Sequence, residues 1–155
     1  MFIKTVINAL EQARVRYVLV GGYAVALHGA VRGTVDLDFV IALESPQFIA
    51  VEEALGRIGL TPRLPLTAVE VFHFREEYIE RRNLVAWSFV NPDNPLELVD
   101  IIITHNADTL DTIYKRVASI GVPIPIASID TLIDMKRLSD RPQDREDIKA
   151  LEKLR

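Results

Sequence analysis

The sequence predicts an α+β domain in which helices alternate with short strands. The chain has 155 residues, the size of one ordinary domain. Hydrophobic residues make up 49% of it and charged residues 26%, a balance typical of a globular protein with a buried core. Segments with apolar residues at helical spacing alternate with short apolar runs that end at turn residues. No repeat, low-complexity tract or linker divides the sequence, so we expect a single domain over residues 1–155.

The first third of the chain predicts alternating helices and strands. Apolar residues recur at three- and four-residue steps near the start, and a short apolar run then ends at two glycines. Ser45 suits an N-cap, with Pro46 at the first helical position. The expected elements are a helix over 2–14, a strand over 17–20, a helix over 22–30, a strand over 35–43 and a helix over 45–58.

The remainder predicts a hairpin followed by C-terminal helices. Residues 91–95, with two prolines and two asparagines, suit a turn between two apolar runs. Two prolines in the extended segment 122–127 favour an edge strand. Ser128 is expected to begin a helix, and Pro142 to separate it from the last one. The expected elements are partly helical structure over 70–82, strands over 84–90 and 96–104, a short helix over 109–116, and helices over 128–138 and 143–154.

Composition excludes several classes of protein. The formal net charge is −4, so the chain as a whole is not a nucleic-acid-binding polycation, although a local basic groove is compatible with it. The absence of cysteine excludes disulfides, thiolate metal sites and cysteine nucleophiles, and it fits a cytoplasmic protein. The most apolar stretch, 17–31, is shorter than the roughly 20 residues needed to span a bilayer, so we expect no membrane segment.

Three aspartates are the most informative residues. Asp36 and Asp38 are two residues apart in a predicted strand, so their side chains are expected to share one face. Asp100 interrupts the apolar run of another predicted strand, where an unpaired buried charge would cost several kcal/mol. If the two strands adjoin, the three carboxylates converge. The alternatives are solvated strand residues for the pair, and a strand end or an arginine partner for Asp100.

Converging carboxylates favour a divalent cation. Two unit charges 4 Å apart repel by on the order of 4 kcal/mol at an effective dielectric of 20. Mg²⁺ relieves such repulsion and is typically bound by one or two carboxylates together with substrate phosphates. Two ions about 3.5–4 Å apart would hold the attacking and leaving oxygens of an in-line displacement. The pattern therefore predicts Mg²⁺ or Mn²⁺ at Asp36, Asp38 and Asp100.

Gly21 and Gly22 follow a predicted strand and begin a predicted helix. Backbone N–H groups at such a junction can hold a phosphate, and glycine lets it approach closely. By itself a pair of glycines is more often only a tight turn.

These features together resemble the nucleotidyltransferase superfamily, which has the polymerase-β-like fold. The matching segments are VGGYAVALHG (20–29), RGTVDLDFV (32–40), VDII (99–102), LIDMK (132–136) and RPQDREDI (141–148). The sequence is most similar to small AbiEii-type, toxin-like members, which have a glycine pair, an arginine and then Asp-x-Asp. The matches span 17–147, but the middle, 44–95, has no recognisable motif. Many members have serine where this chain has Gly22.

The resemblance implies a mixed sheet flanked by helices, and transfer of a nucleoside monophosphate from an NTP to a hydroxyl. The implied metal ligands and catalytic residues are Asp36, Asp38 and Asp100, with Asp100 helping to activate the acceptor. The implied phosphate contacts are Gly21, Gly22, Arg32 and Lys136. Surface salt bridges are an equal interpretation for Arg32 and Lys136. Asp144 and Asp147 are either helix-face partners of Lys136 or solvated, and the sequence favours neither alternative.

Two further functions stay open. The same fold can serve as a non-catalytic nucleotide-binding or protein-interaction module, although such a module need not keep three mutually repelling acids. A structural protein without a ligand is disfavoured by the glycine turn beside the acids. For the enzyme, a small molecule, a tRNA end and a protein hydroxyl are all possible acceptors, and a partner chain such as an antitoxin is possible.

Overall fold

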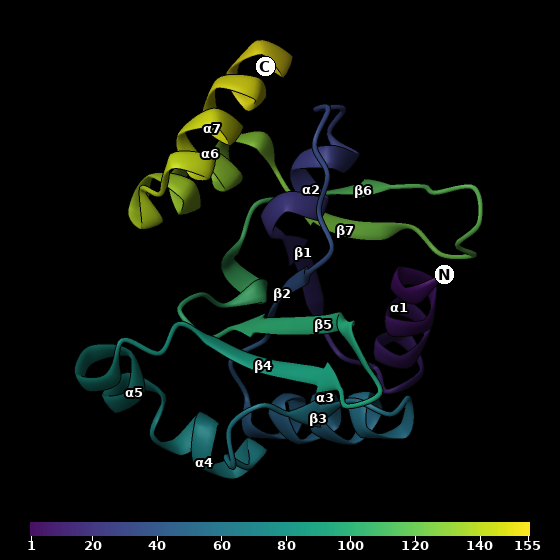
Figure 1. Cartoon of the computed structure of the whole chain (residues 1–155), viewed down its shortest axis with the longest axis vertical. Helices are drawn as coiled ribbons and strands as arrows, with labels where there is room; N and C mark the ends of the chain where they lie inside the picture. The colour runs from purple at the N-terminus through teal and green to yellow at the C-terminus, as the bar shows by residue number, and fades with distance from the viewer.

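A seven-stranded mixed sheet forms the centre of the molecule (Figure 1). The computed structural model describes residues 1–155. The strands lie in the order β3-β4-β5-β2-β1-β7-β6. Their bounds are β1 Tyr17–Val20, β2 Leu37–Ile41, β3 Thr61–Pro62, β4 Ala86–Asn91, β5 Asn94–Ile102, β6 Thr112–Lys115 and β7 Ile124–Ala127. β1 pairs antiparallel with β2 and parallel with β7, while β2 pairs parallel with β5, so the predicted mixed sheet is confirmed.

Helices pack around this sheet. Their bounds are α1 Phe2–Gln12, α2 Gly21–Leu27, α3 Ser45–Arg57, α4 Ala68–His73, α5 Arg75–Arg82, α6 Ile129–Ser139 and α7 Pro142–Leu154, with a 3₁₀ turn η1 at Ala107–Thr109. α6 and α7 lie together at one end of the molecule, and α4 and α5 lie at the other (Figure 1). α2 follows β1 directly and contacts both C-terminal helices. No helix is long and apolar enough to cross a membrane.

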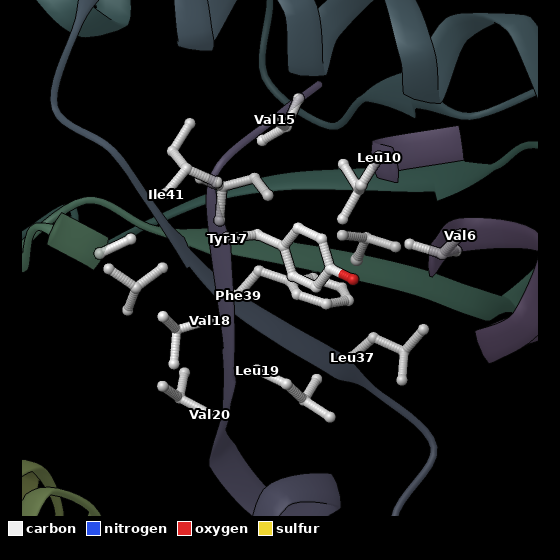
Figure 2. Packing of buried hydrophobic residues seen from close by; sticks show 14 of the residues in the cluster. Val6, Leu10, Val15, Tyr17, Val18, Leu19, Val20, Leu37, Phe39 and Ile41 are labelled. Carbon is white, nitrogen blue, oxygen red and sulfur yellow. The ribbon is translucent and has the colours of Figure 1, made fainter. Parts of the chain in front are cut away.

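The core lies between the central strands and the amphipathic helices. α1 buries one face, formed by Ile3, Val6, Ile7 and Leu10. In Figure 2 the Tyr17 and Phe39 rings, which come from the neighbouring strands β1 and β2, lie beside each other, edge to face with centroids 5.7 Å apart. Each fully buried aliphatic or aromatic side chain stabilises the fold by roughly 1.5–3 kcal/mol. This packing fixes β1 and β2 side by side, and the ends of these strands position the candidate site.

Most elements lie where the sequence predicts them. The strand over 17–20 has the expected bounds, and β4 and β5 form the expected hairpin. Ser128 caps α6 by accepting a hydrogen bond from the Thr131 backbone N–H. Leu37, Phe39 and Ile41 face the core as expected, each at most 1% exposed. Residues 68–82 form two short helices, α4 and α5.

Three local expectations were wrong. The segment 109–116 is not a helix, because its β-favouring residues Thr112, Ile113 and Tyr114 pair with β7 as the edge strand β6. β7 is consequently interior although it contains Pro125 and follows Pro123. The prolines are tolerated because the ladder of β7 with β1 contains the single pair Leu19–Ile126. Ser45 does not cap α3; the helix begins there, with Glu44 at the N-cap and no side-chain cap.

Candidate active site

Asp38 and Asp100 lie opposite each other on adjacent strands. β2 and β5 are parallel neighbours, and their register pairs Asp38 with Asp100. This adjacency is the condition under which the sequence predicts convergence of the acids. On the other side of β5, Ser88 of β4 pairs with Asp100 in register and its hydroxyl donates a hydrogen bond to Asp100 Oδ1. The two carboxylates therefore form the centre of the candidate site.

The glycine turn lies directly against Asp38. Gly21 begins α2 with φ +69°, in the left-handed region that favours glycine. A Cβ at Gly21 would lie 2.0 Å from Asp38 Oδ2, so no other residue fits without displacing the carboxylate. The Gly21 backbone and the Asp38 carboxylate are thus in close contact, and the turn borders the acid pair as the sequence predicts.

The Asp38 carboxyl is electrostatically disfavoured as an anion. Burial, followed by the charge and hydrogen bond of Asp100 and the charge of Asp36, raises its pKa to about 7. Lys136 acts in the opposite direction and lowers the pKa. The ordinary aspartate pKa is near 3.9. An additional cation beside Asp38 would stabilise its ionised form.

Asp36 lies outside the strand that carries Asp38 and is more exposed than the acid pair. The sequence predicts a strand from residue 35, but β2 begins at Leu37, which leaves Asp36 exposed in the preceding segment. It is close enough to raise the pKa of Asp38 by its charge. The protein contains no group of three or more histidine, cysteine, aspartate or glutamate side chains arranged to hold a metal ion. A ligand role for Asp36 therefore stays a prediction.

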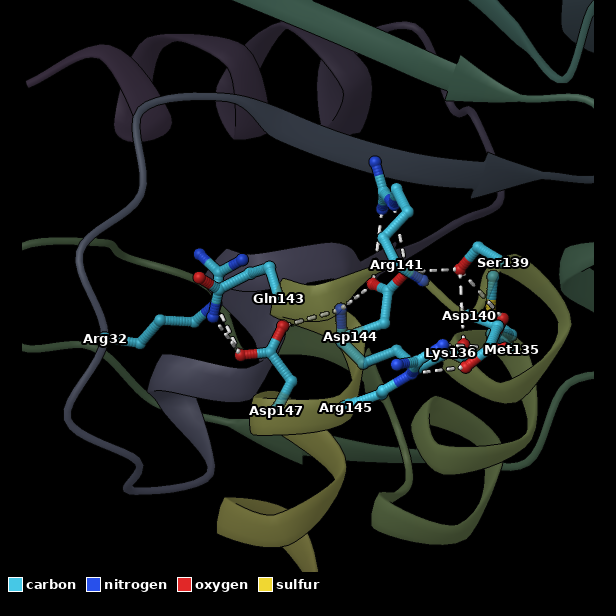
Figure 3. A network of polar contacts seen from close by, with 10 residues as sticks. All are labelled: Arg32, Met135, Lys136, Ser139, Asp140, Arg141, Gln143, Asp144, Arg145 and Asp147. Carbon is cyan, nitrogen blue, oxygen red and sulfur yellow. Dashed lines mark hydrogen bonds and ion pairs between the residues drawn. The ribbon is translucent and has the colours of Figure 1, made fainter.

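Arg32 and Lys136 belong to a buried ion-pair network with the first turns of α7 (Figure 3). Arg32 Nε donates to Asp147 Oδ1 at 2.8 Å, and Lys136 Nζ lies 2.8 Å from Asp147 Oδ2. Lys136 Nζ also donates to Asp144 Oδ1 at 3.3 Å. Both residues implied as phosphate contacts thus form salt bridges, but that of Lys136 is buried and not at the surface. Of the two alternatives for Asp144 and Asp147, pairing with Lys136 is present and solvation is not.

The α7 carboxylates are held as anions. Burial alone would raise the pKa of Asp144, but hydrogen bonds from Arg141 and Ser139 and the charge of Lys136 lower it overall. Burial alone would also raise the pKa of Asp147, but hydrogen bonds from Arg32 and Gln143 and the charge of Lys136 lower it overall. Arg141 and Lys136 both interact electrostatically with Asp38. The network therefore places positive charge beside the acid pair.

Sequence reasoning missed Ser88. The residue stands in the expected strand, but nothing in its local pattern marks it as a partner of Asp100. The hairpin register supplies the contact, and that register contains an irregularity between Val90 and Asn91. Ser88 could have been identified only from a sequence signal that located this irregularity and so gave the correct strand register.

The fold is that of the nucleotidyltransferases. No protein-family model matches the chain, and no curated protein matches its sequence. Solved structures do match, at low sequence identity. The crystal structure of ANT(2")-Ia in complex with adenylyl-2"-tobramycin is 14% identical, with a TM-score of 0.62 over 98% of this chain and 90% of that one.

Two other structures support the same assignment of fold. A solution structure of the antibiotic-resistance factor ANT(2'')-Ia has 14% identity and a TM-score of 0.61, and covers 97% of this chain and 80% of that one. An antigenic nucleotidyltransferase-like protein from Paracoccidioides brasiliensis has 16% identity and a TM-score of 0.60, and covers 96% and 73%. The α+β nucleotidyltransferase-like architecture expected from the sequence is therefore confirmed.

Proposed function

We propose that this protein is a metal-dependent nucleotidyltransferase that moves a nucleoside monophosphate from an NTP to a hydroxyl acceptor. The observation on which this rests is the register pair Asp38–Asp100 against the Gly21 turn, within a nucleotidyltransferase-like fold. A purely structural role does not explain why two half-buried carboxylates face each other when their repulsion disfavours ionisation.

The residues present fit Mg²⁺ or Mn²⁺. Two facing carboxylates match the ligands that Mg²⁺ takes from proteins, with substrate phosphates completing its shell. Burial and the charge of Asp100 raise the pKa of Asp38, so a cation beside the pair would favour its ionised form. Asp38 and Asp100 would hold the ion, with exposed Asp36 as the third ligand. A bound divalent ion would neutralise these carboxylates and polarise the phosphoryl oxygens of the nucleotide.

The remaining roles belong to side chains around this pair. Asp100, oriented by the Ser88 hydroxyl, accepts the proton of the acceptor hydroxyl. The Gly21-Gly22 turn and Arg32 contact the phosphates of the NTP. Lys136 is 6% exposed and bound to two carboxylates, so we assign it an electrostatic contribution to the phosphate site.

The proposed activity is tested by labelling. The protein is incubated with each of four labelled NTPs, Mg²⁺ or Mn²⁺, and fractionated cell extract containing small molecules, tRNA or protein. We expect one fraction to become labelled, which identifies the acceptor class. Asp38→Asn should abolish the labelling. Asp134→Asn is the matched control, because Asp134 is an exposed carboxylate on α6 whose contact is a loose pair with Arg137 at 3.9 Å.

The outcomes separate the candidate functions. Labelling that persists in Asp38→Asn would contradict the assignment of Asp38 and Asp100 as the catalytic centre. NTP binding without transfer to any fraction would instead indicate the non-catalytic nucleotide-binding module. Neither binding nor transfer would rule out both functions.

The finer resemblance to AbiEii-type, toxin-like transferases is also a proposal. It is supported by the glycine pair and by the residue pattern of α6 and α7. Induced expression should then arrest growth, and Asp38→Asn should relieve the arrest at equal protein level. A co-expressed partner that restores growth would be the antitoxin. Unimpaired growth with active enzyme would contradict this assignment.

A further inference from the structure

Asp147 uses both carboxylate oxygens on two different cations. Oδ1 accepts from Arg32 Nε at 2.8 Å, and Oδ2 lies 2.8 Å from Lys136 Nζ. Gln143 Nε2 donates to Oδ1 at 3.0 Å. Asp147 is only 3% exposed, so these contacts replace water almost completely. One side chain of α7 thus fixes a cation from the segment before β2 and a cation from α6.

The position that Asp147 gives Arg32 is unusual. The guanidinium lies over the Gly22 backbone, where a Cβ at residue 22 would be 2.3 Å from Nη1 and 2.6 Å from Cζ. Gly21 and Gly22 are therefore covered in turn, the first by the Asp38 carboxylate and the second by the Arg32 guanidinium. Arg32 Nη1 donates to the Gly33 carbonyl at 3.0 Å, whereas Nη2 has no hydrogen-bond partner in the protein. A donor over the second glycine of the turn is left available.

Lys136 also pairs with Asp147 and is more buried than Arg32. It lies between Asp144 and Asp147, 3.3 Å from Asp144 Oδ1 and 2.8 Å from Asp147 Oδ2. α2, which begins with the two glycines, contacts both α6 and α7. The C-terminal helices are consequently joined to the turn through charged groups as well as packing.

We propose that Asp147 is a positioning residue of the nucleotide site, which holds Arg32 over Gly22 so that the guanidinium acts on the phosphates of the NTP. This proposal rests on the proposed function. It makes α7 part of the site, because Arg32 reaches the turn in a fixed orientation only while Asp147 binds its Nε. Stability alone does not account for the arrangement, since a buried ion pair is often no more stabilising than apolar residues of similar volume.

The test is a double-mutant cycle read by nucleotide binding. Non-hydrolysable analogues of the four NTPs are titrated calorimetrically with Mg²⁺ into full-length protein, and the analogue that binds most tightly is then used. Arg32→Ala and Asp147→Asn should each weaken binding by about 10- to 100-fold, the range expected for losing a hydrogen bond to a charged group. The double variant should be no weaker than Arg32→Ala by more than a few-fold, because Asp147 acts largely through Arg32.

Two further variants keep the test decisive. Asp147→Glu retains the charge but moves the carboxylate by one methylene, so it should weaken binding less than Asp147→Asn; it replaces Asp147→Asn in the cycle if that variant does not fold. Gly22→Ala should displace the Arg32 guanidinium and weaken binding of the NTP analogue when it is the only substitution. Added to Arg32→Ala, it should not weaken binding further. Asp134→Asn should bind as the wild type does.

The outcomes are distinguishable from those of the proposed function. Variants at Asp147 that lower the melting temperature but leave the dissociation constant unchanged would overturn the positioning role, as would fully multiplicative losses in the cycle. Transferase turnover by the wild type with unchanged KM in Asp147→Asn would also overturn it and leave the proposed function intact. A wild type that binds none of the analogues would overturn both.

Discussion

Asp38→Asn should stabilise the metal-free protein at neutral and alkaline pH. The Asp38 pKa is raised from 3.8 to about 7, mainly by burial and then by Asp100. A shift of this size corresponds to on the order of 4 kcal/mol, since one pKa unit is worth about 1.4 kcal/mol. Asparagine removes the charge but still buries an amide, which costs roughly 1–3 kcal/mol when it is not fully hydrogen-bonded. We therefore expect a net gain of about 1–3 kcal/mol at pH 8.

The raised pKa of Asp38 also predicts how the stability of the wild type changes with pH. The folded-state pKa of Asp38 lies above the unfolded-state value, so the folded protein binds more protons between about pH 4 and pH 7. Wild-type stability should consequently fall as pH rises through this window and then level off. The stabilisation in Asp38→Asn should be small near pH 4 and reach its full size above pH 7.

The assay is urea unfolding in EDTA at pH 4, 6 and 8, for the wild type and two variants. Asp36→Asn is the internal comparison, because Asp36 is exposed and should change stability much less. A variant Asp38→Asn that is less stable than the wild type at pH 8 would refute the reasoning. It would mean that hydrogen bonds satisfy the ionised carboxylate. A gain independent of pH would equally contradict an electrostatic origin.

Three further predictions test neighbouring features. Mg²⁺ at 100 times its dissociation constant should stabilise the wild type by about 2.7 kcal/mol and Asp38→Asn far less; equal metal responses in thermal melts would contradict the metal site. Lys136→Met should lower the free energy of unfolding, measured in urea, by about 3–5 kcal/mol, because it leaves Asp144 and Asp147 buried without their shared cation. A loss below about 1 kcal/mol would show that Arg32 and Arg141 are enough to compensate the two carboxylates. Gly21→Ala should lower the free energy of unfolding by at least about 1 kcal/mol, because residue 21 has a left-handed backbone conformation. It should also abolish stabilisation by Mg²⁺, because the added Cβ displaces the Asp38 carboxylate; an unchanged response to Mg²⁺ would refute the close contact between Gly21 and Asp38.

Local pattern determined much of the secondary structure and the candidate residues. The apolar run at 17–20 and the shared core-facing side of Leu37, Phe39 and Ile41 are visible in the sequence, because side chains two residues apart in a strand point the same way. Ser128 and Pro142 mark helix starts through interactions with their own neighbours. The pattern failed at residues 109–116, where pairing with β7 decided the conformation and the local helical signal did not.

The assembly of the site was decided only by tertiary structure. Regular continuation of the hairpin from the Asn91–Asn94 pair would place Ser88 opposite Glu97, but the register shift places it opposite Asp100. Arg32 and Asp147 are 115 residues apart along the chain, and no local propensity records their contact. The sequence by itself predicted which residues could hold a metal ion or a phosphate, because that chemistry resides in side chains and short spacings. Which of them meet was set by strand order, register and the packing of α7 against α2, since these depend on contacts between segments that only the folded chain brings together.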